Sequence, residues 1–164
     1  MQRQLFFICP SDCLEPKINT SYTQENYFYT SLGNAVDFDS NTVLELKQLM
    51  LAKNIRRVFF MLSDDNRFIF DSTTRKTSSS IEVVQSLCAV SALENKLVQL
   101  FWKKCDTKKV ILTNLMNTKI EAFKLALGFS SEEFDVKGII YEKAKNNFNE
   151  IQSFAYHKRL YNLN

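Results

Sequence analysis

Two short polar clusters, each directly after an apolar run, hold the side chains that could do chemistry. The clusters follow residues 5–8 and 58–62, and they consist of Cys9, Ser11, Asp12 and Cys13 in the first and Asp64 and Asp65 in the second. Thiolates and carboxylates are zinc ligands, and burial of a carboxylate pair can raise the pKa of one member. If the fold brings the clusters together, they predict a metal site or an acid pair in a pocket.

Each of these signals also has a simpler structural interpretation. A cysteine at a strand end is more often a small buried hydrophobe than a ligand, and one Cys-x-x-x-Cys without His is a weak metal signal. Asp64 and Asp65 fit solvated turn carboxylates, with an Asp or Asn capping a following helix. His157, the single histidine, lies in a polar tail, so no Ser-His-Asp group is available. If any metal binds, the candidate ligands are Cys9, Cys13 and Asp65.

The elements that must position these clusters are predicted from apolar patterning. Residues 5–9 and 58–62 are continuously apolar, which is typical of strands buried on both faces. Residues 27–32 are aromatic or β-branched and run into the turn signal Gly33-Asn34. A capping box at 42–45 predicts the start of a helix. Strand, turn, helix and strand in this order indicate parallel βαβ pairing.

Further helices are predicted in the second half of the chain. Residues 72–80 are polar and predict a loop, and residues 79–104 predict a long helix with a wide apolar arc, which is typical of burial in a core or against another subunit. Residues 110–112 fit either a short strand or the start of a helix. A capping box at 118–121 predicts a helix that ends at Gly128.

Residues 136–141 and 148–154 predict a closing pair of strands around a polar turn. Together with the preceding elements, this pair predicts an α/β fold with a mostly parallel central β-sheet flanked by helices. The length of the chain predicts a single domain spanning residues 1–164.

Composition and charge exclude several classes of function. The net charge of +3 is too small to indicate nucleic acid as the main partner, and no segment approaches the roughly 18 apolar residues of a membrane span. The N-terminal apolar run is too short for a signal peptide, so we expect a cytoplasmic protein whose four cysteines are free thiols. Basic pairs at 103–104 and 108–109 fit solvated faces or the C-terminal ends of helices.

Four segments resemble the β-class carbonic anhydrases. In that family a strand ends in Cys-x-Asp-x-Arg, a Gly-Asn turn follows a second strand, a third strand ends in His-x-x-Cys-Gly, and a late strand reads His-Gly-x-x-Tyr. The matching segments are Cys9 to Cys13, Gly33-Asn34, Leu62 to Asn66, and Gly138 to Tyr141. Asn66 stands at a family glycine, and Asn is the residue that best replaces glycine in a left-handed backbone. The resemblance implies the same fold and a dimer.

The residues that carry the family's chemistry differ. Cys9 matches the first zinc-binding cysteine, but Leu62 stands in place of the histidine and Asp65 in place of the second cysteine. Ser11 and Cys13 replace the family's Asp–Arg pair, unless a one-residue insertion makes Asp12 the Asp. A catalytic zinc needs about three protein ligands and a water, and leucine cannot coordinate a cation.

We therefore expect a non-catalytic β-carbonic anhydrase-like protein with a degenerate zinc site and no cofactor, acting as a binding or assembly module and forming a homodimer. Its candidate surface is the former active-site cleft, around Cys9, Ser11, Asp12, Cys13, Gly33, Leu62, Asp64 and Asp65. One alternative is a zinc-dependent carbonate dehydratase or related hydratase with rearranged ligands. Another is a protein that binds a small anion or metabolite in the emptied cleft.

Overall fold

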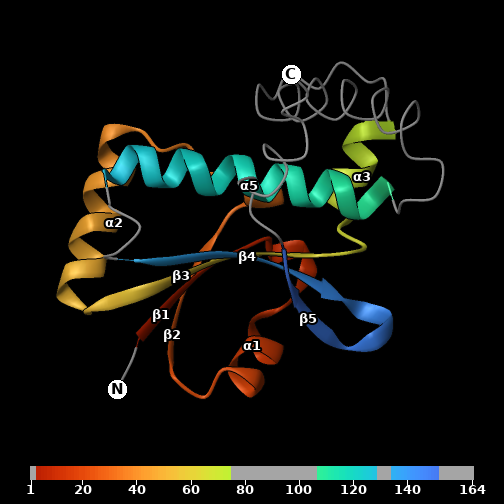
Figure 1. Ribbon diagram of the computed structural model, residues 1–164, viewed down its shortest axis with the longest axis horizontal. Helices are drawn as coiled ribbons and strands as arrows, with labels where there is room; N and C mark the ends of the chain where they lie inside the picture. The colour runs from red at the N-terminus through yellow and green to blue at the C-terminus, as the bar shows by residue number, and fades with distance from the viewer. Residues whose placement is uncertain (1–2, 75–106, 129–133, 152–164) are drawn as a thin grey trace, which may run out of the picture.

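The computed structural model describes residues 3–74, 107–128 and 134–151. Five strands in these segments form one sheet in the order β2-β1-β3-β4-β5. The strands are β1 (Arg3–Ile8), β2 (Glu25–Thr30), β3 (Ile55–Ser63), β4 (Asp135–Glu142) and β5 (Asn147–Glu150). All neighbouring pairs are parallel except β4 and β5, which are antiparallel. The predicted mostly parallel sheet is confirmed (Figure 1).

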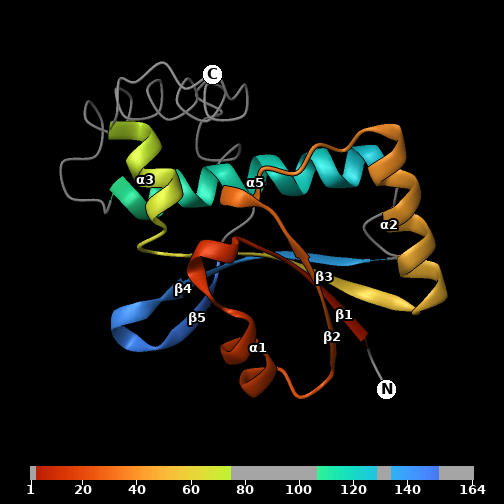
Figure 2. The same cartoon turned by 180° about the vertical axis from the view of Figure 1, so that it is seen from behind.

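Helices flank this sheet on both faces, as predicted. One face carries α2 (Ser40–Ala52), α3 (Arg67–Thr74) and α5 (Thr107–Leu127), and the other carries α1 (Glu15–Ser21) (Figures 1 and 2). The patterning missed α1, although Pro16 in its first turn is a helix-start signal. Short 3₁₀ turns at Pro10–Asp12, Leu32–Asn34 and Lys143–Lys145 complete the described elements.

Successive side chains of a strand point to opposite faces of the sheet. Because helices cover both faces, both sets of side chains in the central strands are buried. Phe7 and Phe60 stack with ring centroids 4.5 Å apart and pack with residues of α2 and α5. On the opposite face Phe6 and Phe59 stack at 4.9 Å and pack near α1. The continuous apolar runs in β1 and β3 therefore reflect two separate layers of core.

Two predicted helix starts are wrong. α2 begins at Ser40 rather than at the predicted capping box, because Asp39 accepts a hydrogen bond from Thr42 N at 2.7 Å and is the N-cap. The second predicted start, Thr118, lies inside α5, where its hydroxyl donates to the carbonyl of Asn114 four residues earlier. Burial of one face of α5 outweighs this local capping signal.

Other predictions at these boundaries have mixed outcomes. Residues 110–112 belong to α5, which resolves their ambiguity in favour of helix, and α5 ends at Leu127 before Gly128 as predicted. Residues 72–74 belong to α3 and were wrongly predicted as loop. The predicted helix at 79–104 and the rest of that loop lie outside the described residues, as do residues 152–154 of the predicted last strand.

Candidate functional site

Cys9 follows β1 directly and is fully buried. Its sulfur accepts a hydrogen bond from Gly33 N at 3.1 Å and lies 2.9 Å from Ser11 Oγ, where either group can donate. The approach of the Gly33 amide depends on a turn in which Gly33 has a φ of +60°. The structure thus brings together three of the predicted residues, Cys9, Ser11 and Gly33, around one thiol.

Leu62 lies in the same interior, near the end of β3, and its side chain is also fully buried. It belongs to a hydrophobic cluster built from β3, β4, α3, α5 and the residue after β1, whose members are Cys9, Leu62, Ile69, Ile111, Leu112, Leu115, Met116 and Ile140. Buried aliphatic side chains generally pack at high density, and they offer no donor atom to a cation. Cys9 therefore belongs to an apolar cluster and also has two polar partners.

Asp12 occupies a different position from Cys9 and links two elements. Its Oδ2 accepts from Ser63 N at 2.8 Å and its Oδ1 from Asn66 Nδ2 at 2.7 Å. Asn66 Oδ1 in turn accepts from Ile69 N at 2.9 Å, which caps the start of α3. Burial raises the pKa of Asp12 above its ordinary value, although the two donors favour the carboxylate and oppose this. Asp12 thus holds the end of β3 and the start of α3 against the turn after β1.

Asp64 and Asp65 are engaged by the turn after β4. Asp65 accepts from Ser63 Oγ at 2.6 Å and forms an ion pair with Lys143 Nζ at 2.8 Å, and Asp64 Oδ1 accepts from the backbone N of Lys143 at 3.2 Å. Lys143, and next the Ser63 hydroxyl, hold the pKa of Asp65 below its ordinary value. Asn66, not either aspartate, makes the predicted side-chain cap of the following helix.

Cys13 is exposed, and its sulfur points to the carbonyl oxygen of Pro10 at 3.6 Å. Within the described residues, no three or more His, Cys, Asp or Glu side chains form a group that could hold a metal ion. The donor chemistry around Cys9 also fits zinc poorly, because a single sulfur is accompanied there by aliphatic carbon, an amide N–H and a hydroxyl.

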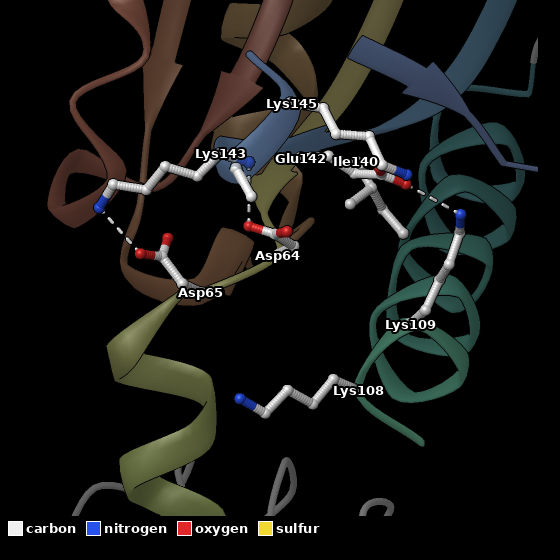
Figure 3. A pocket seen from close by; sticks show the side chains of 9 residues that line it. Asp64, Asp65, Lys108, Lys109, Ile140, Glu142, Lys143 and Lys145 are labelled. Carbon is white, nitrogen blue, oxygen red and sulfur yellow. Dashed lines mark hydrogen bonds and ion pairs between the residues drawn. The ribbon is translucent and has the colours of Figure 1, made fainter. Parts of the chain in front are cut away.

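A cavity of about 770 Å³ lies at the carboxyl ends of β3 and β4, beside the first turn of α5 (Figure 3). Its charged lining consists of four lysines and three carboxylates, Lys108, Lys109, Lys143, Lys145, Asp64, Asp65 and Glu142. Of the predicted site residues, only Asp64 and Asp65 belong to this lining. Of the other predicted residues, Asp12 is half-buried, Ser11 and Cys13 are exposed, and the remaining three are buried (Cys9, Gly33 and Leu62).

The sequence did not predict these lysines as site residues. The basic pair at 108–109 was predicted to lie on a solvated face or at the C-terminal end of a helix. Lys108 and Lys109 lie in the first turn of α5 and not at the C-terminal end of a helix, so the predicted charge complementarity is wrong for this pair. Lys143 and Lys145 flank Ala144 in the turn between β4 and β5. The parallel pairing of β3 with β4 brings the turn after β4 beside Asp64 and Asp65.

In sequence, no family model matches the chain and no curated protein is similar to it. In structure, the chain is similar to solved β-carbonic anhydrases. Wild-type CafD from Aspergillus fumigatus superposes with a TM-score of 0.70 at 14% identity, over 93% of this chain and 90% of that one. A β-carbonic anhydrase of Sordaria macrospora, described as tetrameric, superposes with a TM-score of 0.67 at 11% identity, over 91% of this chain and 80% of that one. A Coccomyxa β-carbonic anhydrase in complex with acetazolamide gives a TM-score of 0.69 at 10% identity, over 96% of this chain and 77% of that one.

These structures share the mostly parallel sheet and its flanking helices. The chain therefore has the β-carbonic anhydrase fold, and the predicted resemblance is confirmed at the level of the fold. In the part of the chain that the structure describes, none of the helices combines the length and the apolar character needed to cross a membrane.

Proposed function

We propose that this chain is a non-catalytic protein with the β-carbonic anhydrase fold, in which the zinc site has been replaced by packed core and which serves as a binding or assembly module. The observation that carries the proposal is the shared burial of Cys9 and Leu62 in one aliphatic cluster. A catalytic zinc must hold a water and lower its pKa to about 7, which needs an open coordination position. An aliphatic cluster supplies neither the remaining ligands nor space for the water.

The environment of Asp12 supports the same proposal. A carboxylate that handles the proton of a metal-bound water must face that water. Each oxygen of Asp12 instead accepts a hydrogen bond within the protein, one from Ser63 N at the end of β3 and one from Asn66 Nδ2 just before α3. Asp12 therefore acts as a brace between elements.

Two further parts of the proposal concern where and how the protein acts. A cytoplasmic location and a homodimer remain our expectations. Leu51 of α2 and Leu125 of α5 are 78% and 85% exposed in the single chain, which supports association with another copy.

A zinc-dependent hydratase using Cys9, Cys13 and Asp65 is the competing enzyme hypothesis. Two of its three candidate ligands have other partners, which counts against this hypothesis. Cys13 donates a hydrogen bond to the carbonyl of Pro10, and Asp65 forms an ion pair with Lys143.

The test combines metal analysis with a hydration assay on the full chain, expressed with added zinc and purified without chelator. We expect substoichiometric zinc and no CO₂ hydration above the uncatalysed rate. The Cys9→Ser and Cys13→Ser variants form a matched pair, and both should leave the metal content unchanged. One zinc per chain that is lost in either variant, with hydration above background, would overturn the proposal in favour of the enzyme hypothesis.

A further inference from the structure

The lysine-lined cavity lies beside the Cys9 interior but is distinct from it. Its lining comes from the end of β3, the end of β4 and its following turn, and the first turn of α5 (Figure 3). A volume of about 770 Å³ falls within the range of sites that hold small molecules. The lining residues Ile140 and Ala144 add an apolar wall to the charged one.

Two of the lysines that line the cavity, Lys108 and Lys109, belong to α5. Lys109 Nζ pairs with Glu142 at 3.1 Å, and Lys108 Nζ lies 5.1 Å from the centroid of the Phe70 ring. Contacts with β4 and α3 therefore hold both ammonium groups at the side of the cavity.

The carboxylates of the cavity are engaged by its own lysines. Glu142, whose side chain is only 15% exposed, forms ion pairs with Lys145 at 2.7 Å and with Lys109 at 3.1 Å. These lysines, Lys145 first, hold the pKa of Glu142 below its ordinary value, so its charge persists near neutral pH. Asp65 is paired with Lys143 in the same way.

These pairs hold ammonium groups at the cavity wall. Among the described residues of the lining, four lysines face three carboxylates. Lysine binds phosphate and carboxylate groups as a compact charge with rotatable donors, so it tolerates oxyanions of different shape. The arrangement suits a ligand with a strongly charged end and a small apolar body.

We propose that this cavity binds a small organic molecule that carries a doubly charged oxyanion, either a phosphate or a pair of carboxylates. The oxyanion contacts the lysines of the α5 turn and of the β4–β5 turn, and the body of the ligand lies against Ile140 and Ala144. This inference rests on the proposed binding role and deepens it by naming the chemical class of the ligand. It requires no particular state of the Cys9 interior.

The test measures binding of phenyl phosphate, inorganic phosphate and succinate by calorimetry at constant ionic strength, with sodium chloride as the balancing salt. Wild-type protein should bind phenyl phosphate or succinate saturably, with phenyl phosphate tighter than inorganic phosphate because of its apolar body. Lys145→Ala should weaken binding roughly tenfold, the usual loss when a hydrogen bond to a charged group is removed.

Lys137→Ala is the matched control, because Lys137 also pairs with a glutamate, Glu150 at 3.0 Å, but lies outside the cavity. It makes the same change in net charge and should leave the affinity unchanged. Absence of saturable binding, or equal weakening by Lys137→Ala and Lys145→Ala, would overturn the inference. Neither outcome would alter the metal content or the hydration rate, so this inference and the proposed loss of catalysis can fail separately.

Discussion

At the scale of single residues, the surroundings of Cys9 determine how its thiol can behave. Its thiol makes two polar contacts, with Gly33 N and Ser11 Oγ, and is otherwise enclosed by apolar side chains. Cysteine in such surroundings behaves as a small hydrophobe, and its reactivity depends on access. Cys13, four residues later, is exposed.

This contrast predicts different rates of alkylation. When the native protein is treated with iodoacetamide and digested, peptide mass spectrometry should find Cys13 modified early and Cys9 modified only after denaturant is added. The physical reason is that Cys9 has no exposed surface in the folded state. Comparable modification of Cys9 and Cys13 in the native protein would contradict the buried position of Cys9.

Asp12 predicts a pH dependence with a definite sign. Burial raises its folded pKa above the ordinary value of 3.8, so its contribution to stability is fully present below that value and is lost as the pH rises through the folded pKa. We expect the free energy of unfolding of the wild type, minus that of Asp12→Asn, to decrease between pH 3.8 and neutral pH. Urea unfolding at a series of pH values measures this difference.

Asp39 supplies the control for this experiment, because its pKa is shifted in the opposite direction. The Thr42 backbone N–H that it caps lowers its folded pKa below 3.8, so its contribution is present above 3.8 and is lost as the pH falls through the folded pKa. The corresponding difference for Asp39→Asn should therefore increase with pH. Slopes of the same sign for the two variants would contradict the assignment for Asp12.

At the scale of elements, the turn after β2 depends on a glycine for two separate reasons. Gly33 has a φ of +60°, and a Cβ built there would lie 2.9 Å from Phe68 Cδ1 and 3.4 Å from Ile69 Cγ1 of α3. The turn therefore sets how closely α3 packs against the chain that follows β2. The same turn directs the Gly33 amide at Cys9.

A pair of glycine variants separates these two effects. Gly128 also has a positive φ, +66°, but a Cβ there would meet no atom of the described residues within 4 Å. Gly128→Ala should cost about 1 kcal/mol from backbone conformation alone. Gly33→Ala should cost a further 1–3 kcal/mol, roughly the cost of overpacking. Urea unfolding measures both, and equal losses would show that α3 is not in close contact with this turn.

At the scale of the whole molecule, the described parts of the chain form a layered structure with a sheet between α1 on one face and α2, α3 and α5 on the other (Figures 1 and 2). The related structures include β-carbonic anhydrases described as tetrameric. Self-association would also cover the exposed leucines of α2 and α5, Leu51 and Leu125.

Sedimentation velocity tests the oligomeric state of the full chain. We expect a dimer of twice the 19.1 kDa chain mass at micromolar concentration. A Leu51→Lys variant should shift the distribution towards monomer if the exposed leucines take part, because a lysine there must be desolvated in the interface. A wild-type protein that sediments as a monomer throughout the micromolar range would contradict the predicted homodimer.

Sequence patterning predicted the strands well and the helix starts poorly, for a physical reason. A strand buried on both faces must be continuously apolar, so β1 and β3 were identified from composition alone. A helix start depends on which of several nearby Asp, Ser and Thr side chains reaches a free N–H. For α2 this residue is Asp39, and for α5 the tertiary core overrides the signal at Thr118.

The sequence by itself determined the class of fold and the absence of a His–Cys pair at the end of the third strand, because these follow from residue types and short-range periodicity. Tertiary structure decided what surrounds each group. Cys9 lies among aliphatic carbons, Asp12 braces α3, and four lysines from two distant segments line one cavity. The reason is that burial and charge pairing depend on which strand ends lie side by side, and the order of strands in a sheet is set by the packing of the whole chain.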